Sequence, residues 1–294
     1  MNVADAMTPR SAVVTVEIPG TRDDVLEYLQ ERQFSSVPVV KATDDGEEFR
    51  GIVSRDALIE QPDEDQLALL VEEVPTTTAD TDITEVAALM VEQGARRVPV
   101  VDGSSTGEGS EPGDGELEGI ITVTDVVRAI AEGDIDGETA VGELATREIN
   151  CVWVETPLPV AEREISHANV PYAVVLDDDG DMTGIITEVD ILDVARVVEG
   201  EADTGESIAD EDDDWKWESV KAVGNSYMPT RNVEIPAEPV RDFMSDDLVT
   251  VSGRRAAKEV AGLMIDNEIE QIPMVSGDAL TGIVQDIDLL RALA

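Results

Sequence analysis

One motif occurs four times along the chain, and this repetition constrains the fold more than any other feature. Each copy holds a short apolar segment that contains a proline. These segments are SVPVV, RVPVV, VPYAVV and QIPMV, which end at Val40, Val101, Val175 and Val275. After a turn, each is followed by a segment that starts with Gly-Ile, at Gly51, Gly119, Gly184 and Gly282. Because both segments are short and β-branched, we predict a two-stranded hairpin in every copy.

An amphipathic helix is predicted before each hairpin. In the second copy Ile83, Val86, Ala87 and Met90 are spaced as residues on one helix face, and the spacing recurs from Ala257 in the fourth copy. Short β-prone segments, at 13–16, 76–79, 151–154 and 248–251, precede the helices, and a second helix follows each Gly-Ile strand. The predicted unit is β-α-β-β-α, of about 60 residues, which is too small to bury a stable core alone. We therefore expect neighbouring repeats to pair.

This arrangement, with its h-P-V-V and G-I-[IV]-[TS]-x-x-D segments, resembles the cystathionine-β-synthase (CBS) domain. The resemblance implies a mixed α/β (α+β) fold in which two CBS repeats pair as a Bateman module and two modules form a pseudo-symmetric disk. The gamma subunit of AMP-activated protein kinase and stand-alone archaeal four-repeat proteins are similar. The predicted divisions are repeats one to three at 1–72, 73–134 and 135–199, an acidic linker with a Trp215/Trp217 insertion at 200–238, and repeat four at 239–294.

The charge of the chain limits its partners and surroundings. Asp and Glu number 66 against 20 Lys and Arg, which gives a net charge of −46. Such self-repulsion is largely screened only at molar salt, so the composition resembles that of proteins from extreme halophiles; an acidic mesophilic protein is the alternative. A phosphate backbone requires a basic face, so we expect no nucleic-acid partner. No apolar run is long enough to span a bilayer, and we expect a cytoplasmic protein without a membrane partner.

The resemblance implies a ribose site after each Gly-Ile strand, where a Thr or Ser and an Asp stand three residues apart. Repeat two has Thr122 and Asp125, and repeat three has Thr187 and Asp190. Repeat four has Gln285 but keeps Asp288, whereas repeat one has Ala57 in place of the Asp, with Asp56 one position early. A carboxylate can accept hydrogen bonds from both ribose hydroxyls. The alternative is that Thr-x-x-Asp only caps the following helix.

Phosphate requires cations, which are scarce in this chain. Arg96 and Arg97 directly precede the proline strand of repeat two, where the gamma-subunit resemblance implies phosphate contact. An arginine guanidinium matches phosphate oxygens and stays charged. The corresponding residues in the other repeats are Ser35 and Ser36, Ala168 and Asn169, and Glu270 and Gln271. The alternative is an exposed arginine pair that balances acidic surface.

No residue set favours catalysis. His167 is the only histidine and Cys151 the only cysteine, and we predict that both are packed in the core. Asp177–Asp181 is predicted to be a hairpin turn, not a calcium loop, and no metal site or catalytic cofactor is expected. The favoured function is non-enzymatic sensing of AMP, ADP, ATP or a related adenosyl compound such as S-adenosylmethionine, bound in the clefts between paired repeats. A regulated partner protein and a homodimer are further expectations. A ligand-independent scaffold and, more distantly, a carboxylate-based enzyme are the alternatives.

Overall fold

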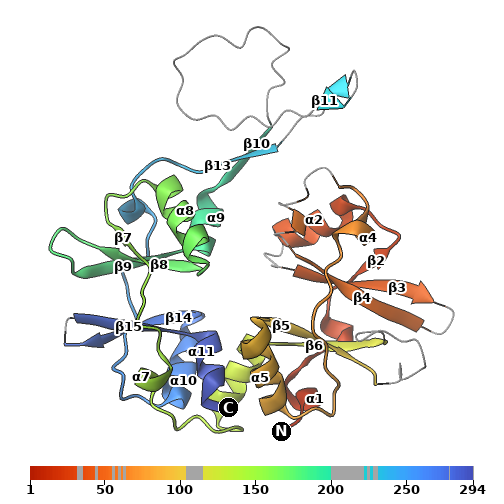
Figure 1. The fold of residues 1–294 in the computed structure, drawn as a ribbon, viewed down its shortest axis with the longest axis horizontal. Helices are drawn as coiled ribbons and strands as arrows, with labels where there is room; N and C mark the ends of the chain where they lie inside the picture. Colours follow the sequence, from red (N-terminus) through yellow and green to blue (C-terminus); the bar gives the residue numbers. More distant parts are fainter. Residues whose placement is uncertain are drawn as a thin grey trace. The chain divides into compact units, whose positions relative to one another are not determined.

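The computed structural model describes most of the four repeats. The described residues are 1–31, 36–43, 46–54, 57–58, 61, 64–103, 115–199, 222–223, 226–227, 231–277 and 279–293. They belong to two compact units (Figure 1). One unit contains Met1–Arg147, Val249–Ser276 and Thr281–Ala294, and the other contains Glu148–Leu248 and Gly277–Leu280. Trp215 and Trp217 lie outside the described residues.

Repeat one forms a three-stranded sheet with helices on one face. Strand β2 (Val16–Ile18) runs parallel to β3 (Ser36–Thr43), which pairs antiparallel with β4 (Gly46–Ser54). Helices α2 (Arg22–Glu31) and α4 (Leu67–Leu70) flank the sheet. Val37, Val39 and Val53 are fully buried in a cluster that also contains Leu67 of α4. The opposite face packs against repeat two, because Val40 and Phe49 cluster with Val101 and Leu117.

Repeat two has the most regular helices. Strands β5 (Arg97–Val101) and β6 (Leu117–Thr122) form the predicted antiparallel hairpin. Helix α5 (Ile83–Gln93) starts at the N-cap residue Asp82, whose side chain accepts a hydrogen bond from the Thr84 amide, and ends at Gly94 in the left-handed conformation. Helix α6 (Val123–Glu132) starts at Thr122 and ends at Gly133, also left-handed. Cap residues therefore fix both ends of both helices.

Repeat three repeats the plan in the second unit. Strand β7 (Cys151–Trp153) is parallel to β8 (Tyr172–Leu176), which pairs antiparallel with β9 (Met182–Thr187). Helices α8 (Leu158–Ala168) and α9 (Glu188–Val194) contact these strands. Strands β10 (Arg196–Glu199) and β13 (Arg231–Glu234) pair after the repeat, as do β11 (Ala222–Val223) and β12 (Ser226–Tyr227). The Asp177–Asp181 segment forms the predicted turn, in which Asp177 Oδ1 accepts the amides of Asp179 and Asp181.

Repeat four consists of the hairpin β14 (Gln271–Ser276) and β15 (Ala279–Gln285), with helices α10 (Ala257–Asn267) and α11 (Asp286–Leu290). Its β-prone segment 248–251 makes only a parallel bridge from Val251 to Met274. Likewise, 76–79 contributes only the bridge from Thr77 to Val100. The strand predicted at 13–16 is displaced to Val16–Ile18. These segments are too short for β propensity alone to set their boundaries.

The residues that lead into each repeat pair with the Gly-Ile strand of another repeat. Strand β1 (Thr8–Pro9) pairs with β6, and Glu72 pairs with Ile52 of β4. Thr146 pairs with Ile283, and Ser245 pairs with Ile185, in the same way. This close approach explains why every repeat has glycine at this position of the strand. A Cβ on Gly119 would lie 2.5 Å from Thr8 O, and one on Gly282 would lie 3.0 Å from Thr146 O.

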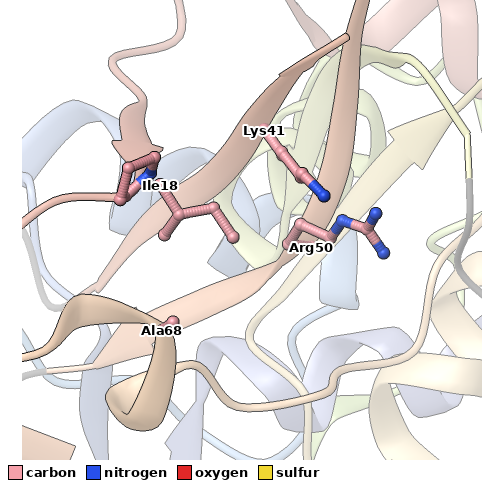
Figure 2. Close-up of a pocket in the computed structure, with 5 residues that line it drawn as sticks. Ile18, Lys41, Arg50 and Ala68 are labelled. Carbon is pink, nitrogen blue, oxygen red and sulfur yellow. The ribbon is translucent and has the colours of Figure 1, made fainter.

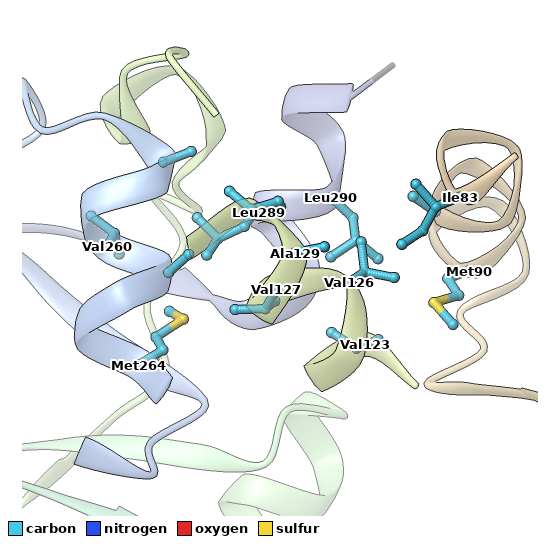
Figure 3. Packing of buried hydrophobic residues seen from close by; sticks show 14 of the residues in the cluster. Ile83, Met90, Val123, Val126, Val127, Ala129, Val260, Met264, Leu289 and Leu290 are labelled. Atoms are coloured by element: carbon cyan, nitrogen blue, oxygen red, sulfur yellow. The ribbon is translucent and has the colours of Figure 1, made fainter. Parts of the chain in front are cut away.

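Repeats two and four share one hydrophobic core (Figure 3). Helix α6 packs on α10, and α11 packs on both α5 and α6. The buried side chains between these helices include Val127, Val260, Met264 and Leu289. Burial of a Val, Leu or Met side chain contributes about 1.5–3 kcal/mol. This shared core therefore joins the two repeats, although repeat three lies between them in the sequence.

The prediction that His167 and Cys151 are packed in the core is wrong, because both are exposed. The buried face of α8 carries Leu158, Ala161 and Ile165, and His167 lies in the last turn on another face. On β7 the side chains alternate, so buried Val152 places its neighbour Cys151 outward. In both cases the residue type predicted burial, but the position of the residue along its helix or strand places its side chain on the exposed face.

Candidate functional site

The Thr-x-x-Asp motif of repeat two lies at the junction of β6 and α6. Asp125 Oδ2 accepts the Thr122 amide at 2.9 Å and the Thr122 hydroxyl at 2.8 Å. The Asp125 amide in turn donates to Thr122 Oγ1 at 3.3 Å. The other carboxylate oxygen, Oδ1, lies 3.4 Å from exposed Arg128. The motif is therefore a capping box, and one carboxylate oxygen remains weakly engaged at the edge of the cap.

Repeat three reproduces this geometry. Asp190 Oδ2 accepts the Thr187 amide at 2.8 Å and the Thr187 hydroxyl at 2.7 Å. The Asp190 amide donates to Thr187 Oγ1 at 3.3 Å. Among the described residues, no side chain donates a hydrogen bond to Asp190 Oδ1. The same carboxylate that caps α9 thus keeps an acceptor available for a ligand hydroxyl.

Repeat four holds its Asp in a closed environment. Asp288 Oδ2 accepts the Gln285 amide at 3.0 Å, and Oδ1 accepts from Arg291 at 2.8 Å. Its side chain is only 3 % exposed. Burial raises the pKa of Asp288, and nearby Asp286 adds to this rise, against the lowering effects of the Gln285 amide and Arg291. Asp288 therefore has both oxygens occupied, unlike Asp190.

Repeat one has the cap without the acid. The Ala57 amide donates to Ser54 Oγ at 3.0 Å, which places Ala57 where the other three repeats carry Asp. Asp56 lies outside the described residues. A methyl group offers no acceptor, so this position cannot bind a ribose diol.

Arg96 and Arg97 lie next to the repeat-two cap but contact different neighbours. The Val123 amide donates to Arg96 O at 3.0 Å, and Arg97 lies opposite Thr122 in the β5–β6 register. Arg97 donates to Ser36 Oγ of repeat one at 3.0 Å. Burial, and then repulsion from Arg96, lower the pKa of Arg97. Arg97 and Thr122 are therefore neighbours in the sheet, next to the first turn of α6 that holds Asp125.

The guanidinium of Arg96 is held by repeat four. Its two terminal nitrogens donate to the two carboxylate oxygens of Asp286, at 3.2 and 2.7 Å, and Nη2 also lies 3.0 Å from Glu270 Oε2. Burial opposes the charge, but attraction to Asp286 and Glu270 outweighs it, so the pKa of Arg96 is raised. This ion pair was not predicted from the sequence. Its signal was present, because the position of Arg96 in repeat two is taken by the acidic Glu270 in repeat four.

A separate cavity of about 430 Å³ lies in repeat one (Figure 2). Its lining residues are Ile18, Pro19, Lys41, Arg50 and Ala68. Arg50 forms an ion pair with Glu48 at 2.5 Å, which offsets one of the two positive charges. Lys41 follows Val40, so it points to the sheet face opposite the one that packs on repeat two. None of the predicted ligand residues lines this cavity.

Comparison with known proteins identifies the repeats. The CBS domain family model matches residues 3–64, 68–132, 141–196 and 240–294. The chain belongs to the CBS domain family. Each of the four repeats is thus a CBS domain, and the fold predicted from the repeated motifs is confirmed. No helix in the described part of this CBS protein has both the length and the apolar character needed to cross a membrane.

Proteins and solved structures from archaea resemble nearly the whole chain. The chain is 27% identical over 292 residues to protein MJ1404 of Methanocaldococcus jannaschii, covering 99% of this chain but 62% of that protein, which is less than two thirds. Protein MJ1225 of the same organism is 24% identical, with 96% and 95% covered. A crystal structure from Pyrococcus horikoshii, 26% identical, superposes over 100% of both chains with a TM-score of 0.69. The MJ1225 crystal structure, described as a candidate archaeal homologue of γ-AMPK, has 20% identity and a TM-score of 0.68 over 100% of both chains.

Proposed function

We propose that this CBS protein is a non-catalytic regulator that binds adenine nucleotides or a related adenosyl compound. The observation that carries the proposal is the repeated cap of repeats two and three, in which Asp125 and Asp190 keep one carboxylate oxygen at the edge of the helix N-terminus. A ribose diol needs such an acceptor, and a helix N-terminus favours a nearby phosphate.

The sites are unequal in this proposal. In repeat two, the only side-chain contact of Asp125 Oδ1 among the described residues is the one of 3.4 Å to exposed Arg128, and Arg97 lies on the adjacent strand. Repeat two is therefore the stronger nucleotide site in this proposal. Repeat three has the open carboxylate but Ala168 and Asn169 in place of the arginines, which supports binding of an adenosyl group with less phosphate contact. Repeat four, with buried Asp288, and repeat one, with Ala57, are the degenerate sites.

The test is calorimetric titration of adenosine, AMP, ATP and S-adenosylmethionine in molar KCl against Asp125→Asn and Asp190→Asn variants. Asparagine keeps an oxygen for the cap but loses the carboxylate, so we expect at least a tenfold loss of affinity at the altered site. The combined Arg96→Ala/Arg97→Ala variant should lose affinity for AMP and ATP and retain adenosine binding, because adenosine makes no phosphate contact. The variant also loses the ion pair between Arg96 and buried Asp286, so circular dichroism must show that it is folded.

Asp82→Asn is the matched control, because Asp82 caps α5 through its side chain and belongs to no Thr-x-x-Asp motif. It should bind every ligand as the unaltered protein does. Unchanged affinity in both Asp125→Asn and Asp190→Asn, or no binding of any ligand, would favour a ligand-independent scaffold whose motifs only cap helices. Unchanged AMP and ATP affinity in the double arginine variant would reject the phosphate role.

A further inference from the structure

We infer that Asp286 and Glu270 of repeat four are specificity-determining residues for the ligand site of repeat two. They hold Arg96 as a carboxylate clamp that the phosphate of a ligand must displace. This inference rests on the proposed function and extends it. Repeat four competes with the ligand phosphate for Arg96, and its helix α11 is affected when the phosphate binds.

The clamp is built around a buried acid. Asp286 binds both terminal nitrogens of Arg96, and its side chain is only 6 % exposed. Its Oδ1 also accepts the Ile287 amide at 2.7 Å. Glu270, with a side chain that is 58 % exposed, supplies the third contact to Arg96. A two-point guanidinium–carboxylate pair has the same geometry as a guanidinium–phosphate pair, so the two anions compete for one donor set.

The clamp joins equivalent positions of two repeats. In repeat two the Val123 amide donates to Arg96 O, and in repeat four the Asp286 amide donates to Glu270 O at 2.8 Å. Glu270 therefore corresponds to Arg96, and Asp286 corresponds to Val123. At or beside the junction between the Gly-Ile strand and the following helix, repeat two carries a basic residue and repeat four carries acidic ones. Their opposite charges allow these two equivalent surfaces to attract each other.

Displacement of the clamp has a consequence for repeat four. A buried carboxylate that loses its cation bears an uncompensated charge, which is strongly unfavourable. Asp286 is the first residue of α11, and α11 packs on α5 and α6 in the shared core. A phosphate that takes Arg96 therefore biases the position of α11. By linkage, a partner that moves α11 changes the affinity of repeat two for phosphate by the same factor.

The clamp also sets ligand selectivity. Adenosine has no group that competes for Arg96, so its binding is independent of the clamp. For phosphate-bearing ligands, the apparent affinity equals the intrinsic affinity multiplied by the fraction of time that Arg96 is released. If the clamp is closed about nine tenths of the time, its removal strengthens their binding about tenfold.

The decisive experiment compares ATP, AMP and adenosine binding to the unaltered protein, Asp286→Asn, Glu270→Gln and Glu48→Gln by calorimetry. Asparagine can still accept the Ile287 amide, so α11 keeps that contact. Glu48→Gln is the matched control because it changes the net charge equally and removes an acid from another arginine, Arg50. We expect about tenfold tighter ATP and AMP binding to Asp286→Asn, a smaller gain for Glu270→Gln, and unchanged adenosine affinity in all variants.

Equal ATP and AMP affinities in Asp286→Asn, Glu270→Gln and the unaltered protein would overturn the clamp while leaving the proposed function intact. A similar gain in Glu48→Gln would assign the effect to net charge and would also overturn it. Because Glu270 is largely exposed, Glu270→Gln tests the clamp even if Asp286→Asn does not fold. Failure of ATP, AMP and adenosine to bind any of the four proteins would reject the proposed function together with the clamp.

Discussion

The acidic residues at the start of the second helix in repeats two, three and four differ in what surrounds them. Thr122, Asp125, Thr187 and Asp190 were predicted from the sequence to bind ribose, with helix capping as the alternative role. The structure shows that Asp125 and Asp190 each cap a helix. The sequence could not show that the equivalent Asp288 is buried, because burial depends on the repeats packed around α11. It could not place Asp286 beside Arg96 either, because 190 residues separate them along the chain.

The buried Asp288 predicts a pH-dependent stability difference. Burial raises the pKa of Asp288 in the folded state above its value in the unfolded chain. The ionised carboxylate thus weakens the fold above its folded-state pKa, and protonation relieves this as the pH falls through that value. We expect Asp288→Asn to increase the free energy of unfolding most at neutral pH.

The measurement is denaturant unfolding of both proteins at several values between about pH 7 and about pH 4. The advantage of Asp288→Asn should shrink steadily as the pH falls. An advantage that grows toward acid pH would mean that the ion pair with Arg291 dominates, contrary to the direction given by burial.

At the scale of elements, periodicity predicted the helices well and did not predict the bridges made by the lead-in residues. Helices α5, α8 and α10 begin near the first residue of each apolar pattern, because one face of each is buried in a core. The lead-in segments carry no comparable pattern. They are held by bridges to strands of other repeats, such as Thr8 to Ile120, and local propensity contains no information about such partners.

The lead-in bridge predicts a large effect for Gly119→Ala. Its Cβ would lie 2.5 Å from Thr8 O, so β1 must move or detach from β6. We expect a loss of about 1–3 kcal/mol in the free energy of unfolding, as for other overpacked sites. Circular dichroism during denaturant titration would measure it.

Gly262→Ala is the matched control for this substitution. A Cβ on Gly262 meets nothing within 4 Å, and the residue lies inside α10. The change should leave stability unchanged or raise it by about 0.5–1 kcal/mol, because alanine favours the helix. Similar destabilisation by both substitutions would show that the bridge to Thr8 does not constrain Gly119.

For the whole molecule, the number of repeats and their family were predictable because the same motif recurs four times. The shared core of repeats two and four was not, since each helix pattern predicts a buried face without naming the helix that covers it. The net charge of −46 was available from composition, and its effect on stability follows from screening.

We predict that added KCl stabilises the fold, because it screens repulsion among acidic side chains. The thermal midpoint should rise between about 0.2 M and about 2 M KCl. A variant with Glu132→Gln, Asp134→Asn and Glu138→Gln, all at exposed positions at the end of α6 or after it, should show a smaller rise. A flat midpoint, or the same slope in the variant, would contradict a role for surface repulsion.

The lead-in bridges also bear on folding during synthesis. Thr8 leaves the ribosome long before Ile120, and Thr146 long before Ile283, so early segments must wait for strands that are translated later. Such long-range pairing is slow to form and leaves apolar edges exposed in the meantime. The nascent chain of this protein should therefore remain dependent on chaperones until its last hairpin has emerged.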